Sequence, residues 1–350
     1  MATLSPGDLL ASRYRLLDPI GAGGMSVVWR AHDEVLSRIV AVKVLAPSLA
    51  ADERFRAMVR DEARSAAQLV HPHVTAVHDY GEHIVDGVLV AFVVMELVTG
   101  EELEARLAAG PLPWPEAVHI CAQVADALAA AHRMGVVHRD ITPGNIMLTP
   151  LGVKVLDFGI ATRIGAPDED EDGNTFGTPA YVAPERLDGK PALPATDTYS
   201  LGVLLYEMLT GRPPYPAETW EDLNEALRTE PPPPSAPGLP PAIADLCLRC
   251  LARDPHQRPS AQQVAALLRA ELPATSSPSR ATPSPQGRRG AQRVGVLVTA
   301  SVIALAALLF FDPSGSPRRP VGMAPPAKPT PSSASWTHNL PTPSSPRRRR

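Results

Sequence analysis

The spacing of apolar positions divides residues 1–272 into a part rich in short strands and a later part rich in helices. Aliphatic runs predict strands over Tyr14–Leu17, Val27–Ala31 and Ile39–Val44, and the Ala-rich, charged stretch Arg54–Leu69 predicts a helix. Farther along, apolar residues recur every three to four positions, which predicts helices over Ala117–Met134, Thr198–Leu209, Ile243–Leu251 and Ala261–Ala270. We therefore expect an α+β fold of two lobes, a β-rich lobe over residues 14–95 and a helical lobe over residues 99–272, with a cleft between them.

This periodicity ends near Leu272. Residues 273–293 and 312–350 consist largely of Pro, Ser, Thr and Arg, and such segments bury too little apolar surface to offset the entropy lost on folding. We expect the first to be a disordered linker and the second a Pro-, Ser- and Arg-rich tail.

Residues 294–311, between the linker and the tail, contain neither charge nor proline. As a helix they would reach about 27 Å, against a hydrocarbon core of about 30 Å. Their Val, Leu, Ile and Phe residues favour insertion by about 3 to 7 kcal/mol. A buried core helix would need amphipathic partners, and the flanking sequence offers none. The segment therefore predicts one transmembrane helix.

Overall charge and cysteine content exclude other classes. A net charge of −4 argues against binding along a nucleic-acid backbone, although Arg347–Arg350 form a basic cluster. The close pair Cys247 and Cys250 lacks the second pair or His doublet of a zinc site, so we expect two buried residues on a helix. The N-terminus lacks the pattern of a secretion signal.

A glycine-rich turn lies between the first two predicted strands. Glycines at such a turn let backbone N–H groups approach phosphates. In a dinucleotide-binding loop a helix would follow, whereas here the sequence continues as a strand, which favours a hairpin. The turn and its first flanking residues comprise Gly21, Ala22, Gly23, Gly24, Met25 and Ser26.

Lys43 lies within the apolar strand segment Val40–Val44, where a lysine needs a partner if it is buried. Glu62, on the helix that follows, is the expected partner. Taken alone, a lysine reaching toward solvent and a solvated helical Glu would explain the two residues equally well.

Three further motifs follow in a fixed order. His138-Arg139-Asp140 is followed five residues after the aspartate by Asn145, then by Asp157-Phe158-Gly159 and later by Ala183-Pro184-Glu185. Their order and spacing match the signature of protein kinases. Over residues 8–272 the chain resembles the Hanks-type Ser/Thr protein kinases of bacteria.

The resemblance implies a bilobal kinase fold, ATP as phosphate donor and proteins as substrates. Lys43, held by Glu62, would grip the α- and β-phosphates, and Asn145 and Asp157 would bind Mg²⁺, with Mn²⁺ as an alternative. Asp140 would orient the substrate hydroxyl and accept its proton.

The nucleotide pocket and two supporting contacts also follow from the resemblance. Met95 would be the gatekeeper of a hinge in which the backbones of Glu96 and Val98 meet adenine, while Val28 and Ala41 cover the ring from above. An ordinary buried strand would look the same in the sequence. The remaining family positions are Asp197, expected to anchor the catalytic loop, and Glu185 with Arg258, expected to pair.

The chain departs from the family pattern at Thr142, where Ser/Thr kinases usually carry a lysine that touches the transferred phosphate. Losing a charge-assisted hydrogen bond of roughly 1.5 to 3 kcal/mol would slow transfer by about ten-fold to more than a hundred-fold. We expect a slow but active kinase. The alternative is a weakly active or inactive pseudokinase scaffold.

The activation segment contains a second unusual feature, the acidic run 168–172. In related kinases an arginine at the position of Arg139 pairs with a phosphorylated residue of this segment. The acidic run is either a substitute for that phosphate or a solvated loop of like charges. Thr175 is the best candidate for autophosphorylation, and Thr178 matches the threonine of the substrate-docking loop.

A small-molecule phosphotransferase is the nearest competing enzyme class, but it lacks the Ala183-Pro184-Glu185 segment. Positive charges on the two sides of the predicted span are nearly balanced and do not set its orientation. We expect the kinase domain in the cytoplasm, where ATP is available, one pass through the cell membrane and the tail outside. The resemblance leaves a homodimer open, and no nucleic-acid partner is expected.

Overall fold

The computed structural model describes residues 4–23, 26–158, 179–217 and 219–272 of the chain. These residues belong to one compact unit, Met1–Pro278. The predicted linker, membrane span and tail lie outside the described residues. Among the described helices none has both the length and the apolar character needed to cross a membrane.

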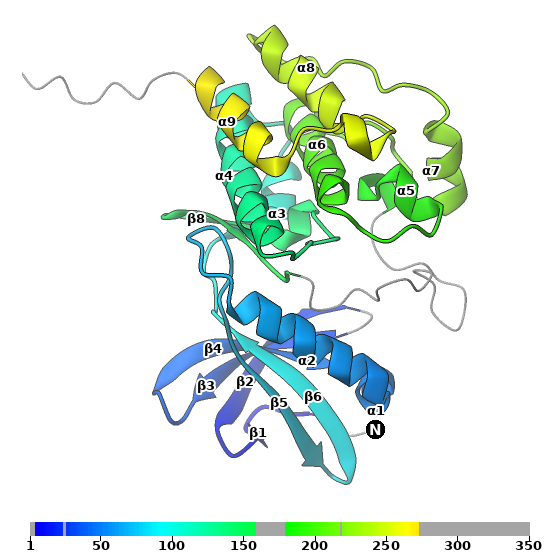
Figure 1. The fold of residues 1–350 in the computed structure, drawn as a ribbon. Helices are drawn as coiled ribbons and strands as arrows, with labels where there is room; N and C mark the ends of the chain where they lie inside the picture. Colours follow the sequence, from blue (N-terminus) through cyan, green and yellow to red (C-terminus); the bar gives the residue numbers. More distant parts are fainter. Residues whose placement is uncertain (1–3, 24–25, 159–178, 218, 273–350) are drawn as a thin grey trace, which may run out of the picture. The chain divides into compact units, whose positions relative to one another are not determined.

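The first lobe is built on a six-stranded antiparallel sheet with strand order β1-β2-β3-β4-β6-β5 (Figure 1). Side chains alternate between its faces, so that Val40 and Val42 enter one apolar cluster while Ala41 and Leu45 enter another. The strands are β1 Leu9–Leu10, β2 Tyr14–Ala22, β3 Ser26–Asp33, β4 Arg38–Leu45, β5 Val77–Val85 and β6 Val88–Met95.

Helix α2 (Glu53–Ala67) covers the face of the sheet that contains Ala41 and Leu45. The short helix α1 (Pro47–Ala51) leads into it, and Asp52 caps α2 by accepting hydrogen bonds from two backbone N–H groups. Such a cap stabilises a helix by about 1 kcal/mol. The buried residues Phe55, Val59 and Ala63 recur every fourth position, which fixes the face that α2 turns toward the sheet. Lys43 lies on this same face by alternation along β4.

The second lobe is helical and surrounds α6 (Pro194–Thr210), which is buried on nearly all sides. Helix α4 (Trp114–Arg133) packs against both α6 and α9 (Ala261–Glu271), and α8 (Pro241–Cys250) packs against α6 (Figure 1). The other helices are α3 Leu103–Leu107, α5 Pro184–Leu187, α7 Trp220–Ala226 and the 3₁₀ turns Pro143–Asn145, Pro179–Tyr181 and Pro255–Gln257.

A small sheet holds the segments that flank the site. Strands β7 (Glu101–Glu102), β8 (Ile146–Thr149) and β9 (Gly152–Val155) pair in that order. The catalytic-loop motif precedes β8, and the Asp157 motif follows β9. The N–H of Thr75 donates to the carbonyl of Val155 at 3.0 Å, so this sheet is also tied to the segment between α2 and β5.

The predicted strands and helices of residues 14–272 are confirmed, with shifted ends. The helix expected to start at Ala117 begins at Trp114 instead, because Pro115 fits the first turn of a helix, where its missing N–H costs nothing. Cys247 and Cys250 are buried on α8, as expected.

Candidate active site

The glycine-rich turn is a hairpin between β2 and β3. Gly21 lies opposite Val28 and Ala22 opposite Val27, and the N–H of Gly23 donates to the carbonyl of Ser26 at 2.9 Å. A strand follows the turn, so the hairpin alternative is confirmed over the dinucleotide-binding loop. Gly24 and Met25 lie outside the described residues.

The residues expected around adenine converge from three strands. Ala41 of β4 pairs in register with Met95 at the end of β6, and Val28 of β3 pairs with Lys43. Ala41 and Met95 are buried. Beyond β6 the N–H of Glu96 donates to the carbonyl of Ala76 at 2.8 Å, and its carboxylate binds Lys154 at 2.9 Å. The Glu96 backbone is thereby fixed, and Val98 follows two residues later.

The ion pairs of the site differ from the expected combination. Lys43 Nζ lies 3.0 Å from Asp157 Oδ2, whereas Glu62 Oε1 accepts a hydrogen bond from Arg139 Nη1 at 2.8 Å. The expected contact between Lys43 and Glu62 is therefore absent from this arrangement, and that prediction needs correction. Buried charges require partners. Here Lys43 pairs with Asp157, and Arg139 pairs with Glu62.

Glu62 sits in an environment that disfavours its charge. Its side chain is 12% exposed, and Oε2 is buried without a hydrogen-bond partner among the described residues. Burial raises the pKa of Glu62 to about 7, although the charge and hydrogen bond of Arg139 act in the opposite direction. The carboxyl group therefore exchanges its proton near neutral pH.

Asp140 is held in place by the rest of the catalytic loop. Asn145 Nδ2 donates to the carboxylate Oδ2 of Asp140 at 2.8 Å and to its backbone carbonyl at 2.9 Å. With the amide nitrogen used in this way, the carboxamide oxygen of Asn145 stays available as a ligand. Thr142 lies between them in sequence, and its carbonyl accepts from the N–H of Asn145 at 3.1 Å.

Asp197, at the start of α6, holds the catalytic loop through hydrogen bonds. Its fully buried carboxylate accepts hydrogen bonds from the backbone N–H groups of His138 at 2.8 Å and Arg139 at 2.7 Å. His132 Nε2 of α4 is 2.7 Å from the same carboxylate. His132 was not among the predicted site residues; its only signal in the sequence is a histidine near the end of a largely apolar helix, just before the loop.

The backbone is strained at two points of the site. Arg139 has a φ of 74° and Asp157 a φ of 52°, in the left-handed region that residues other than glycine rarely adopt. Such a conformation costs on the order of 1 to 3 kcal/mol and persists only where the surroundings impose it. Here the Asp197 carboxylate holds the Arg139 N–H, and Lys43 holds the Asp157 side chain.

Phe158 links the Asp157 segment to the catalytic loop. Its buried ring packs edge-on against His138, with the ring centroids 4.7 Å apart. His138 Nε2 lies 2.7 Å from the carbonyl of Leu156, and the N–H of Asp140 donates to His138 Nδ1 at 3.3 Å. This pattern places the imidazole proton on Nε2. The Asp157 segment and the catalytic loop are therefore packed against each other.

The donors available to a metal ion suit Mg²⁺. Asp157 supplies a carboxylate and Asn145 a carboxamide oxygen, which are the hard oxygen ligands that this ion prefers. Among the described residues there is no group of three or more His, Cys, Asp or Glu that would form a closed metal cage. A two-ligand site fits an ion that keeps water and phosphate oxygens in its remaining positions.

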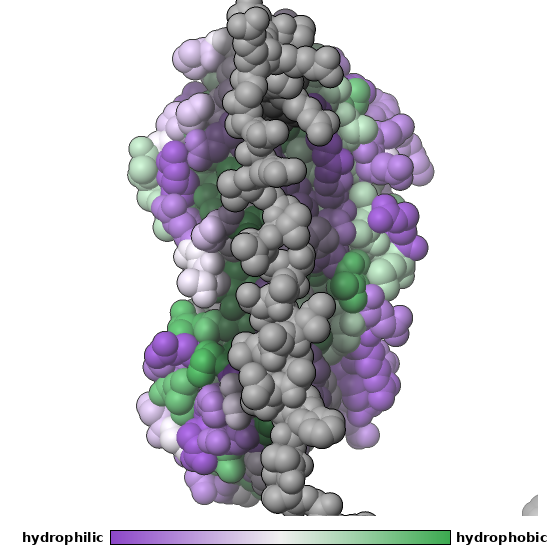
Figure 2. All heavy atoms as spheres, turned by 90° about the vertical axis from the view of Figure 1, so that its left-hand side faces the viewer, coloured by the Kyte–Doolittle hydropathy of each residue, from purple (hydrophilic) through white to green (hydrophobic). Residues whose placement is uncertain are grey.

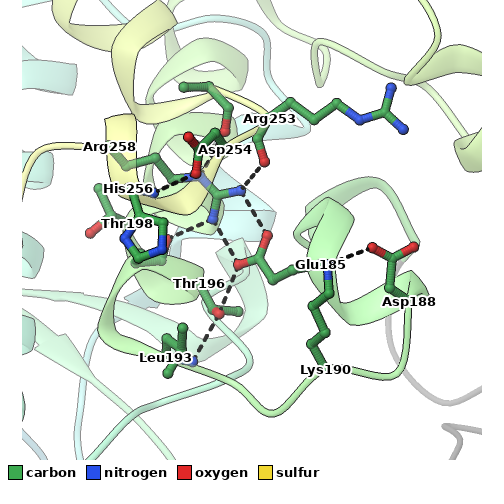
Figure 3. A network of polar contacts seen from close by, with 12 residues as sticks. Glu185, Asp188, Lys190, Leu193, Thr196, Thr198, Arg253, Asp254, His256 and Arg258 are labelled. Carbon is green, nitrogen blue, oxygen red and sulfur yellow. Dashed lines mark hydrogen bonds and ion pairs between the residues drawn. The ribbon is translucent and has the colours of Figure 1, made fainter.

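Glu185 and Arg258 form a buried, two-pronged ion pair (Figure 3). Arg258 Nη1 and Nη2 donate to the two carboxylate oxygens at 2.8 and 2.7 Å, and Thr196 Oγ1 donates to Glu185 at 2.9 Å. Burial alone would raise the pKa of Glu185, but the Arg258 hydrogen bonds bring it below its ordinary value. Arg258 also donates to the backbone carbonyls of Ala195 and Ala252, so the pair joins α5 and α6 to the segment after α8.

The activation segment falls largely outside the described residues, and so do the acidic run 168–172, Thr175 and Thr178. The structure describes it again from Pro179. There Tyr181 donates a hydrogen bond to Glu207 of α6, a contact that the sequence analysis did not anticipate. A carboxylate in the apolar second half of α6 is the signal that marks Glu207.

A two-lobed fold with a lysine on the sheet, an aspartate after β9 and a braced catalytic loop defines a protein kinase. Residues 14–267 match the protein kinase domain family, and the chain belongs to this family. It is 42% identical over 290 residues to serine/threonine-protein kinase PknA of Mycobacterium tuberculosis, covering 79% of this chain and 67% of PknA. Serine/threonine-protein kinase PksC of Streptomyces coelicolor is 37% identical over 296 residues, covering 81% and 53%. The crystal structure of the Mycobacterium tuberculosis PknI kinase domain has a TM-score of 0.60 at 29% identity, covering 77% of this chain and 99% of that one.

Proposed function

We propose that this chain transfers the γ-phosphoryl group of ATP to Ser and Thr hydroxyls of proteins, itself included, in bacterial signalling. The observation that carries the proposal is the 3.0 Å contact between Lys43 and Asp157, which are 114 residues apart. It brings the lysine of the sheet and the aspartate of the second lobe to one place. The named serine/threonine-protein kinases among its relatives support Ser/Thr as acceptors.

Each residue of the site has a distinct task in phosphoryl transfer. Lys43 is positioned to bind the phosphates of ATP once Asp157 turns to a metal ion. Asp140, fixed by Asn145, orients the acceptor hydroxyl and takes its proton. Mg²⁺, when bound by Asp157 and Asn145, neutralises charge on the phosphates. The protein thus contributes mainly positioning and electrostatics.

Protein substrates are favoured over small molecules by the Glu185 segment. The Glu185–Arg258 pair fixes α5, which directly follows the described end of the activation segment. A small-molecule phosphotransferase needs no such platform. Thr142 supplies a hydroxyl and no charge at the position of the expected lysine, which is a reason to expect slow transfer.

Anchoring and self-association complete the proposal. The apolar segment 294–311 would hold the kinase domain at the cytoplasmic face of the cell membrane with the tail outside. Figure 2 shows a face of the molecule on which hydrophobic patches lie between hydrophilic margins. At the β3–β4 turn Val35 and Leu36 are 67% and 55% exposed, which supports a contact between two kinase domains.

Transfer of radiolabelled γ-phosphate tests the function. With Mg²⁺ or Mn²⁺ we expect label on Ser or Thr of the chain and of a generic basic protein, and none with Lys43→Met or Asp140→Asn. Absence of label with retained ATP binding would instead support a pseudokinase scaffold.

If label is incorporated, mapping of the phosphorylated residues shows whether Thr175 is modified. Full activity without phosphate on Thr175 would favour the acidic run as a substitute for that phosphate.

A further inference from the structure

The two most exposed large hydrophobic side chains of the described residues project from adjoining segments. Val70, between α2 and β5, is 92% exposed, and Leu151, in the β8–β9 turn, is 97% exposed. These segments touch, because His73 Nδ1 lies 2.9 Å from the carbonyl of Val153. In Figure 1 the β8–β9 turn extends from the left side of the second lobe. Exposed apolar residues that gather in one place mark a surface for a partner.

Positive charges surround the same segments. Burial lowers the pKa of His71 below its ordinary value, and neighbouring basic groups lower it further. These groups come from the α2–β5 segment, the last turn of α4, strand β9 and the last turn of α9: His73, Arg133, Lys154 and Arg269. We call the surface formed by Val70, His71, Arg133, Leu151, Lys154 and Arg269 the basic face.

Two cations of the basic face already have a carboxylate partner. Lys154 pairs with Glu96, and Arg269 pairs with Asp126. Arg133 is exposed and forms no ion pair with a described residue. The ionised side chains of this surface therefore leave one positive charge in excess, which attracts an anionic surface modestly.

A hollow of about 280 Å³ opens beside the exposed apolar residue Val70. Aliphatic side chains form most of its lining, and Lys154 and His71 are its basic groups. An apolar hollow beside basic groups suits an amphiphile with an anionic head, such as a phospholipid, better than a wholly polar ligand.

The chain leaves the described domain close to the basic face. Leu272 follows Arg269 by three residues, and 21 residues separate Leu272 from the predicted membrane span at Val294. At about 3.3 Å per residue this connection cannot exceed roughly 70 Å. A tether of this length keeps the domain near the bilayer at an effective concentration in the mM range, so even a weak attraction is enough to hold it there.

We propose that the basic face docks onto the anionic headgroups of the bilayer that anchors the chain, with Val70 and Leu151 entering the boundary between headgroups and acyl chains. The inference rests on the anchor of the proposed function, because the tether supplies the high local concentration. Each cation near an anionic leaflet favours docking about five-fold, and apolar side chains that enter the interface add to this. An acidic protein would meet the same charges, but the tether places the bilayer always within reach.

Quenching by lipid tests the docking. The chain has three cysteines and all are buried, so a thiol-reactive fluorophore labels Val70→Cys or Leu151→Cys selectively. The full chain is reconstituted in vesicles of phosphatidylcholine, with or without phosphatidylglycerol, that contain a nitroxide quencher at headgroup depth. The control Leu193→Cys places the fluorophore at an exposed site between α5 and α6, outside the basic face.

We expect quenching at positions 70 and 151 to be several-fold stronger with phosphatidylglycerol than without it and to weaken as salt is added. Quenching at position 193 should be the same in both kinds of vesicle. Arg133→Gln should lower the ratio of docked to free domain about five-fold, whereas Arg228→Gln, at an exposed arginine after α7, should leave it unchanged. Equal quenching at all three positions, or quenching that does not respond to phosphatidylglycerol, would overturn the proposal.

Further outcomes separate docking from the other proposals. Selective quenching in a chain that alkaline carbonate extracts would support the basic face as a lipid-binding surface and remove the membrane span. Selective quenching without phosphate transfer would support docking and remove the kinase function. A fluorescence change at position 70 with polyglutamate but not with phosphatidylglycerol would assign the basic face to an acidic protein and overturn docking on the bilayer.

Discussion

Thr142 occupies the catalytic-loop position at which the kinase pattern predicts a lysine. Thr142→Lys restores a cation beside the transferred phosphate, and we expect phosphate transfer to increase by about ten-fold to more than a hundred-fold. The measurement is the single-turnover rate at saturating ATP. Leu151→Lys, at a fully exposed site in the β8–β9 turn, introduces the same charge elsewhere and should leave the rate unchanged. An unchanged rate in Thr142→Lys would show that this position does not limit turnover.

Glu62 also makes stability depend on pH. Burial raises its folded pKa to about 7, above the value of about 4.3 in an unfolded chain. The folded state therefore binds the proton more tightly, and this contribution is complete below about pH 4 and lost as pH rises through 7. Relative to Glu62→Gln, the free energy of unfolding of wild type should fall by about 2 to 3 kcal/mol between about pH 5 and pH 8. Denaturant unfolding at several pH values measures it, and a pH-independent difference would contradict the assignment.

Between elements, the Glu185–Arg258 pair fixes α5 against the segment that follows α8 (Figure 3). Arg258→Met leaves the Glu185 carboxylate buried without its cation, so we expect a loss of about 3 to 5 kcal/mol in the free energy of unfolding. The double variant with Glu185→Gln removes both charges and should recover part of that loss. If the two substitutions are additive in a double-mutant cycle, the pair is not the reason for the effect.

How far the sequence predicts these elements depends on whether the signal is local. Helices such as α4 and α6 follow from apolar spacing, and the β2–β3 hairpin follows from the glycine turn between aliphatic runs. β5 was not predicted, because its residues His78, Asp79, Glu82 and His83 interrupt any apolar alternation. Its place in the sheet comes from pairing with β6, which is a contact between strands rather than a property of either.

Within the site, motif order predicted which residues gather but not how their charges combine. Lys43, Glu62, Arg139 and Asp157 are all named by the kinase pattern, yet the pattern pairs Lys43 with Glu62. The observed combination depends on where α2 lies relative to the catalytic loop, which no motif encodes. His132 and Glu207 were missed for a related reason, since the role of a polar residue on a largely apolar helix depends on the partner it faces.

At the scale of the molecule, we expect membrane association to depend on the segment 294–311 and ATP binding to depend on residues 1–272. The full chain is expected to co-sediment with phospholipid vesicles after reconstitution and to resist extraction by alkaline carbonate. A fragment of residues 1–272, which lies within the compact unit Met1–Pro278, should remain in the supernatant and retain ATP binding. Carbonate extraction of the full chain would contradict the membrane span, and loss of ATP binding by the fragment would contradict an independent kinase domain.

Asp197 determines how much of the chain must be synthesised before the catalytic loop acquires its geometry. It holds the N–H groups of His138 and Arg139 although it follows them by 59 and 58 residues. A ribosome therefore completes the catalytic loop well before it makes the side chain that braces the loop. Since a domain generally folds as a unit as it emerges from the ribosome, the catalytic geometry forms only after α6 has appeared. Translation itself thus delays phosphorylation until most of the second lobe exists.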